Sequence, residues 1–152
     1  MTASEAPADV ESRGAATGRV LKLFTDGASR GNPGLSGAGA LITTKEGEIV
    51  ATERLFLGRA TNNEAEYRAV ILGLEAVLGH DPRHVEIYLD SELVVRQLNG
   101  DYRVKNSRLA RLHREARGLI DRLRGCTIRH IERALNAEAD RLANEAIDQR
   151  DR

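Results

Sequence analysis

The chain has 152 residues, 41% of them hydrophobic, which suits a single domain with a sizeable core and leaves little room for a second one. Its 23 basic and 23 acidic residues cancel, and this balance excludes a protein that coats nucleic acid through bulk positive charge and also an acidic disordered chain. The single Cys126 excludes an internal disulfide. Because residues 1–19 lack a secretory signal, we expect a cytoplasmic protein that is not inserted in a membrane.

The start of the chain differs in composition from the rest. Residues 1–19 are rich in Ala, Ser, Thr, Gly and acids and show no apolar periodicity, which predicts a disordered tail. Periodic structure begins at Val20. We therefore assign residues 20–150 to one folded domain without internal repeats.

Three strands are predicted in the first part of this domain. Val20–Thr25 alternates apolar and polar residues and is followed by Asp26. Residues 27–39 contain five glycines and a proline, which predicts a long turn. Ala38–Thr44 and Glu48–Leu57 are predicted as two further strands joined by a hairpin turn, so we expect an antiparallel meander.

After residue 60 the apolar period becomes helical, and two helices flank one short strand. Thr61–Leu78 has apolar residues at helical spacing, with Thr61 and Asn62 as suitable N-cap residues. Val85–Leu89 predicts a strand, and Ser91 is a suitable cap for a helix that runs to Asn99.

The last third of the chain predicts two helices around one strand. Ser107–Arg124 carries an apolar stripe at helical spacing, Thr127–Ile131 predicts a strand, and Asn136 is expected to cap a final helix. Strands that are separated by helices usually pair in parallel. We therefore expect an α/β fold with a five-stranded mixed sheet, three strands antiparallel and then two parallel, flanked by helices.

Four acids stand where such a fold can bring them together. Asp26 and Asp90 each follow an apolar strand, and functional sites gather at the carboxyl ends of parallel strands. Glu66 lies in the first turns of its helix, and Asp140 lies one turn into the last helix. Each acid alone is equally consistent with a turn former, a cap or a favourable partner of a helix dipole.

A cluster of these acids would need cations. Each close pair of carboxylates would repel by about 4 kcal/mol at an effective dielectric constant of about 20. Oxygen ligands alone select Mg²⁺ or Mn²⁺. Two such ions about 4 Å apart would make a centre that cleaves phosphodiester bonds.

Four segments resemble, in the right order, the signature blocks of type 1 ribonuclease H. The segments are Thr25–Gly34, Thr61–Tyr67, Leu89–Ser91 and Asn136–Ala143, and the resemblance extends over residues 20–147. It implies a ribonuclease H-like fold and a catalytic domain at residues 20–150. The implied activity is endonucleolytic cleavage of the RNA strand of RNA–DNA hybrids, leaving 5′-phosphate and 3′-hydroxyl ends.

The resemblance also implies roles for individual residues. Asp26, Glu66, Asp90 and Asp140 match the family's catalytic, metal-binding acids, with two Mg²⁺ ions expected, Mn²⁺ as a substitute, and Asp26 shared between the ions. Contacts to the hybrid are expected from ten residues: Gly27, Ser29, Asn32, Thr61, Asn62, Asn63, Ser91, Lys105, Arg133 and Asn136. Short amides suit the 2′-hydroxyls that distinguish RNA from DNA, and glycines would let the backbone approach the ribose.

The sequence departs from the family pattern at two places. Many members carry a mobile His before the last helix, whereas here residues 132–135 contain none. His130 lies within the last strand pattern and is expected to be structural, so Arg133 is the candidate to hold a phosphate. A Trp-rich basic protrusion is also missing. The compact form resembles the archaeal and actinobacterial branch, some members of which also cut double-stranded RNA.

Substrate affinity is therefore expected to come from other cations. Residues 96–133 contain eleven basic and four acidic residues, a net charge of +7. Arg108, Arg111 and Arg114, with Lys105, could follow a phosphate backbone, although a solvated helix face is an equal alternative. A non-catalytic nucleic-acid-binding module and a different nuclease of the same fold remain the competing hypotheses. We expect a monomer without an obligate protein partner.

Overall fold

The computed structural model describes residues 18–150, so the predicted N-terminal tail lies almost entirely outside the described residues. One sheet and four α-helices make up this part of the chain. The elements in chain order are β3 (Val20–Gly31), β4 (Gly34–Thr44), β5 (Ile49–Ala60), α1 (Asn62–Leu78), β6 (His84–Leu89), α2 (Glu92–Leu98), α3 (Ser107–Ile120), β7 (Cys126–His130), a 3-10 turn η1 (Arg133–Asn136) and α4 (Ala137–Asp148). Within residues 18–150, no helix is both long and apolar enough to cross a membrane.

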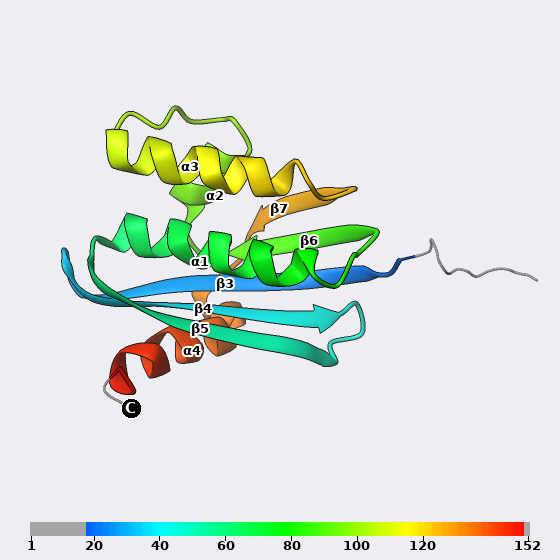
Figure 1. Ribbon diagram of the computed structural model, residues 1–152, viewed down its shortest axis with the longest axis horizontal. Helices are drawn as coiled ribbons and strands as arrows, with labels where there is room; N and C mark the ends of the chain where they lie inside the picture. The colour runs from blue at the N-terminus through cyan, green and yellow to red at the C-terminus, as the bar shows by residue number, and fades with distance from the viewer. Residues whose placement is uncertain (1–17, 151–152) are drawn as a thin grey trace, which may run out of the picture.

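The sheet has the predicted mixed topology. Its strand order is β5-β4-β3-β6-β7, with β3, β4 and β5 antiparallel and β6 and β7 joined in parallel to β3. Figure 1 shows α1 and α3 on one side of the sheet and α4 on the other. The main core lies between the sheet and α1, where Leu23, Leu74 and Ile87 are fully buried. The prediction of a five-stranded mixed α/β sheet is confirmed.

The predicted long turn over residues 27–39 is wrong. The strand β3 continues to Gly31, and β4 begins at Gly34, so a tight turn of Asn32 and Pro33 with a cis peptide bond joins two long strands. The glycines suggested a turn, but most of them are paired in the strand ladder, as Gly27 is with Ala38.

Three of these glycines instead let helices lie close to the sheet. A Cβ on Gly27 would lie 2.3 Å from the backbone carbon of Ala65 in α1. A Cβ on Gly37 or Gly39 would lie 2.2 or 2.4 Å from backbone carbonyl oxygens of α4. Since backbone atoms cannot move aside as a flexible side chain can, only glycine permits this packing.

The helix ends follow from local hydrogen bonds. Thr61, one of the two predicted N-cap residues, caps α1, and it forms a capping box with Glu64. The helix α3 ends at Ile120, earlier than predicted, because Arg122 and Leu123 form tighter turn hydrogen bonds to carbonyls three residues back. Asn136 does not cap α4 through its side chain, contrary to the prediction.

Candidate active site

The two strand acids lie at the edge where β3 and β6 separate. Asp90 directly follows β6. Asp26 lies within β3 rather than after it, two residues beyond Phe24, the last β3 residue paired with β6. Phe24 pairs with Tyr88, and the two acids each lie two residues further along the chain. Asp26 and Asp90 are therefore level with each other at this edge of the sheet.

Asp26 faces the α4 side of the sheet. Its cross-strand partner is Gly39, and the missing Cβ of Gly39 points at Ala139 and Ala143 of α4. Because paired residues on neighbouring strands point to the same face, the Asp26 side chain points towards the helix that carries Asp140. Asp26 is only 5% exposed.

Glu66 reaches the same place from α1. The Gly27 backbone N–H donates a hydrogen bond of 2.9 Å to Glu66 Oε1. This contact is available because α1 lies against Gly27 with no side chain between them. The glycine therefore brings the Glu66 carboxylate next to Asp26.

Three of the four acids form a tight cluster. Carboxylate oxygens of Asp26, Glu66 and Asp90 lie within 4.8 Å of one another. Asp140 lines the same cavity of about 420 Å³ as Asp26 and Glu66. It is close enough to Asp26 for its charge to raise the pKa of that carboxyl.

Burial and mutual repulsion hold protons on the cluster. Burial, followed by the charges of Glu66, Asp90 and Asp140, raises the pKa of Asp26 to about 9. Burial likewise raises the pKa of Glu66 to about 7, although the Gly27 N–H and the Arg133 charge act in the opposite direction. Such carboxyls are poised to exchange protons for a bound cation.

The donor set fits a divalent cation. All the converging ligands are carboxylate oxygens, the kind that Mg²⁺ and Mn²⁺ prefer. Asp90 Oδ2 is buried and has no hydrogen-bond partner among the described residues. A buried carboxylate oxygen without a partner is costly, and a cation would satisfy it.

Most of the residues expected to contact the hybrid surround this cluster. Gly27, Ser29, Asn62 and Arg133 line the acidic cavity. A neighbouring cavity of about 330 Å³ is lined by polar side chains, one acid, one arginine and one leucine. Its lining residues are Asn32, Thr61, Asn63, Glu64, Asn106, Arg108 and Leu109. The two cavities lie on either side of Thr61–Asn63, where α1 begins.

Three of the expected contact residues are placed differently. Asn136 is only 1% exposed, and its Nδ2 donates a hydrogen bond of 2.9 Å to the Thr25 carbonyl. Asn136 thereby fastens the start of α4 to β3, and its contact with a duplex stays a prediction. Ser91 accepts a hydrogen bond from Val94 N and caps α2. Lys105 is exposed in the loop before α3 and lines neither cavity.

Arg133, in η1 before α4, is better placed than His130 to hold a phosphate. Arg133 lines the acidic cavity and lowers the pKa of Glu66. His130 is exposed at the end of β7 and does not line that cavity.

Sequence reasoning missed two groups at the site. Asn144 lines the acidic cavity, and its position four residues after Asp140 on one helix could have indicated this. Asn106, which caps α3, lines the neighbouring cavity together with Arg108. No local pattern indicates that the start of α3 lies beside the start of α1.

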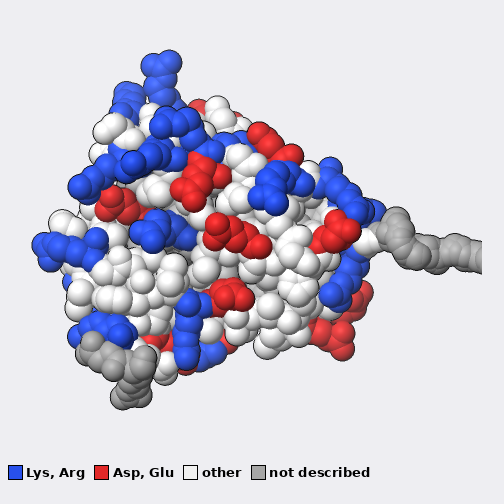
Figure 2. Space-filling model, in the orientation of Figure 1, with Lys and Arg blue, Asp and Glu red and all other residues white. Residues whose placement is uncertain are grey.

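Arginines extend this surface beyond the two cavities. A further cavity of about 280 Å³ shares Glu64 and Arg108 with the previous one and adds Arg59, Arg68 and Arg111. Figure 2 shows Lys and Arg side chains gathered over the end of the molecule where α1 and α3 begin. We call these four arginines, residues 59, 68, 108 and 111, the arginine groove.

Comparisons with known proteins point to one family. A family model described as reverse transcriptase-like matches residues 24–146. Ribonuclease HI of Halobacterium salinarum is 44% identical over 86% of this chain and 65% of its own length. A bifunctional protein of Mycobacterium tuberculosis is 41% identical over 83% of this chain, and the chain spans only 35% of that relative's length.

Solved structures agree. RNase H1 of Halobacterium salinarum superposes with a TM-score of 0.83 at 42% identity, covering 86% of this chain and 98% of that one. LC11-RNase H1 in complex with an RNA/DNA hybrid superposes with a TM-score of 0.81 at 38% identity, again over 86% and 98%.

Proposed function

Because this chain belongs to the type 1 ribonuclease H family, we propose that it is a metal-dependent endoribonuclease that hydrolyses the RNA strand of RNA–DNA hybrids. The products would carry 5′-phosphate and 3′-hydroxyl ends. Residues 20–150 would form the catalytic domain. The observation that carries the proposal is the carboxylate cluster of Asp26, Glu66 and Asp90, with Asp140 beside it.

Two divalent cations are proposed at this cluster, Mg²⁺ or Mn²⁺, with Asp26 shared between them. Glu66 and Asp90 would complete one site and Asp140 the other. The ions, when bound, would activate the attacking water and stabilise the leaving oxygen. The acids would hold the ions, the Gly27 N–H orients Glu66, and Arg133 would attract the scissile or product phosphate.

Recognition of the hybrid would use the polar rim of the cluster. Asn32 Oδ1 accepts a hydrogen bond from Asn62 N, which joins the β3–β4 turn to the start of α1. The amides of this rim can both donate to and accept from 2′-hydroxyls in the wide minor groove of a hybrid. Double-stranded RNA offers the same groups on both strands and is the second substrate to assay.

Cleavage assays test the proposal directly. Labelled RNA–DNA hybrid, double-stranded RNA and double-stranded DNA are incubated with Mg²⁺, with Mn²⁺ and with chelator. We expect the hybrid to be cut only with metal, and double-stranded DNA to stay intact. Hybrid cleavage in chelator would contradict the metal assignment, and tight binding without cleavage of any duplex would favour a binding module.

The arginine groove is expected to hold duplex phosphates. In an inactive Asp26→Asn background, replacing Arg108 and Arg111 with Ala should reduce the slope of log Kd against log salt by about 1–2, because each phosphate contact contributes about 0.9. Fluorescence anisotropy of a labelled hybrid at several salt concentrations measures this slope. Arg124→Ala is the matched control, since Arg124 pairs with Asp81 at 2.8 Å and does not line the groove. An equal change per arginine removed in the two variants would argue for bulk charge instead.

A further inference from the structure

We propose that Asn144 is a positioning residue for the Asp140 carboxylate, and that Arg30 orients the Asn144 amide for this task. The inference rests on the proposed metal-binding role of Asp140. Asn144 lines the acidic cavity without belonging to the carboxylate cluster. It matches none of the residues that the sequence motifs indicated.

The contacts form a chain from the cavity to the β3–β4 hairpin. Asn144 Nδ2 donates to the Asp140 carboxylate Oδ1 at 3.2 Å and to the Asp140 carbonyl at 3.0 Å. Arg30 Nη2 donates to Asn144 Oδ1 at 3.2 Å. Arg30 Nη1 in turn pairs with Asp148 Oδ1 at 2.8 Å. Asp140, Asn144 and Asp148 follow at intervals of four residues and so share one face of α4.

Arg30 determines which way the amide points. A guanidinium has donors and no acceptor, so the Asn144 side-chain oxygen must face Arg30. The amide N–H groups are then directed at Asp140. A reversed amide would place its oxygen against the carboxylate and repel it. Arg30 and Asp140 therefore favour the same orientation of the amide, and removing Arg30 leaves Asp140 alone to hold it.

A fixed Asp140 matters because metal affinity depends on how ligands are held. Removing a residue that hydrogen-bonds a metal ligand typically costs 10–100-fold in metal affinity or activity. Asn144 contacts only Oδ1 of the Asp140 carboxylate and makes no contact with Oδ2. It also restricts rotation of a side chain that is half-buried at the cavity wall.

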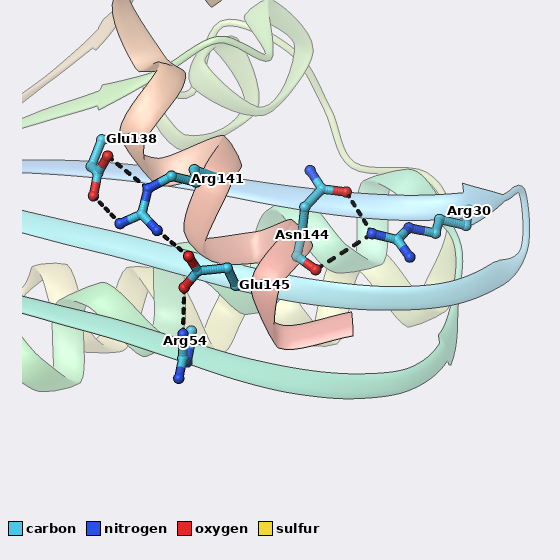
Figure 3. Close-up of polar contacts among 6 residues, drawn as sticks. All are labelled: Arg30, Arg54, Glu138, Arg141, Asn144 and Glu145. Atoms are coloured by element: carbon cyan, nitrogen blue, oxygen red, sulfur yellow. Dashed lines mark hydrogen bonds and ion pairs between the residues drawn. The ribbon is translucent and has the colours of Figure 1, made fainter. Parts of the chain in front are cut away.

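Figure 3 shows a second polar group on the same helix that serves as a control. Glu145 lies next to Asn144 but pairs with Arg54 and Arg141, and Arg141 also pairs with Glu138. None of these four residues lines the acidic cavity. Glu145→Gln therefore weakens ion pairs on α4 without removing a contact to Asp140.

Calorimetric titration of the nucleic-acid-free protein with Mn²⁺ tests the inference. We expect Asn144→Ala to bind Mn²⁺ at least about 10-fold more weakly, and Glu145→Gln to bind within about 2-fold of the wild type. Arg30→Ala should weaken binding less, and adding it to Asn144→Ala should have no further effect, because both act through one amide. In cleavage assays, Asn144→Ala should need about 10-fold more Mg²⁺ for half-maximal kcat with an unchanged KM for the hybrid.

The outcomes separate the inference from the proposed function. No Mn²⁺ binding by the wild type would overturn both. Equal Mn²⁺ affinity of wild type and folded Asn144→Ala, or equal losses in Asn144→Ala and Glu145→Gln, would overturn the inference alone. If Asn144→Ala does not fold, Arg30→Ala is the variant that tests the inference, because Arg30 is exposed. An Mn²⁺ affinity of Arg30→Ala equal to that of the wild type would then count against the inference.

Discussion

Asp26→Asn should abolish hybrid cleavage and, in the absence of divalent cations, should make the protein more stable than the wild type. The loss of activity should reach at least about 10³-fold, because Asp26 is at the centre of the acid cluster. The gain in stability follows from the raised pKa of Asp26, about 9. An amide of the same shape cannot ionise, so the unfolded variant does not gain the free energy that the unfolded wild type gains by releasing this proton.

The direction in which stability changes with pH depends on whether the folded or the unfolded chain holds the Asp26 proton. Between about pH 4 and about pH 9 the folded wild type keeps the Asp26 proton, whereas the unfolded chain releases it. Unfolding therefore releases a proton, and wild-type stability falls as pH rises through this range. At pH 8 we expect Asp26→Asn to be more stable by at least about 2 kcal/mol, which corresponds to at least about 4–8 °C in Tm.

Thermal unfolding in chelator at pH 5 and pH 8, and again with Mg²⁺, measures these effects. The gap between variant and wild type should widen with pH, and Mg²⁺ should raise the Tm of the wild type far more than that of the variant. Asp121→Asn is the control, since Asp121 is an exposed acid whose side chain is 69% accessible and pairs with Arg117. Its Tm should change by about 1 °C or less. A lower Tm for Asp26→Asn in chelator would contradict the electrostatic account.

Gly27→Ala should destabilise the fold rather than only weaken substrate binding. The new Cβ would lie 2.3 Å from the Ala65 carbonyl carbon and 2.5 Å from Glu66 N. Both are backbone atoms, so α1 itself must move away from β3. Overpacking of this kind costs about 3 kcal/mol, or about 6–12 °C in Tm. The same displacement would break the Gly27 N–H bond to Glu66, so cleavage by the folded fraction should also fall.

Gly118→Ala provides a matched comparison. Gly118 lies within α3, and a Cβ there would meet nothing within 4 Å. Alanine is a better helix former than glycine by about 1 kcal/mol, so this variant should be slightly more stable than the wild type. Urea unfolding of the two variants measures both changes. Unchanged stability for Gly27→Ala with a weaker hybrid Kd would instead favour the role in ribose contact that the sequence suggested.

The elements that the sequence predicted well are those with a regular local pattern. Alternation located the start of β3, and helical spacing with a capping residue located α1, whose N-cap is Thr61. The prediction of a turn over residues 27–39 was wrong because a glycine that fits a turn and a glycine that fits under a helix have the same local signature. The hydrogen bond that buries Asn136 likewise has no local signature, because its partner in β3 lies more than a hundred residues away in the chain.

The sequence by itself determined the strand and helix order, the mixed sheet and the family of this chain. It also identified four acids, because strand ends, helix starts and motif spacing are properties of neighbouring residues. The tertiary structure decided which side chains share the cavity: Glu66 reaches Asp26 only because α1 lies on Gly27, and Asn144 faces Arg30 only because α4 lies on the β3–β4 hairpin. Those contacts join residues 39 and 114 positions apart, and their geometry is set by packing that no local pattern records.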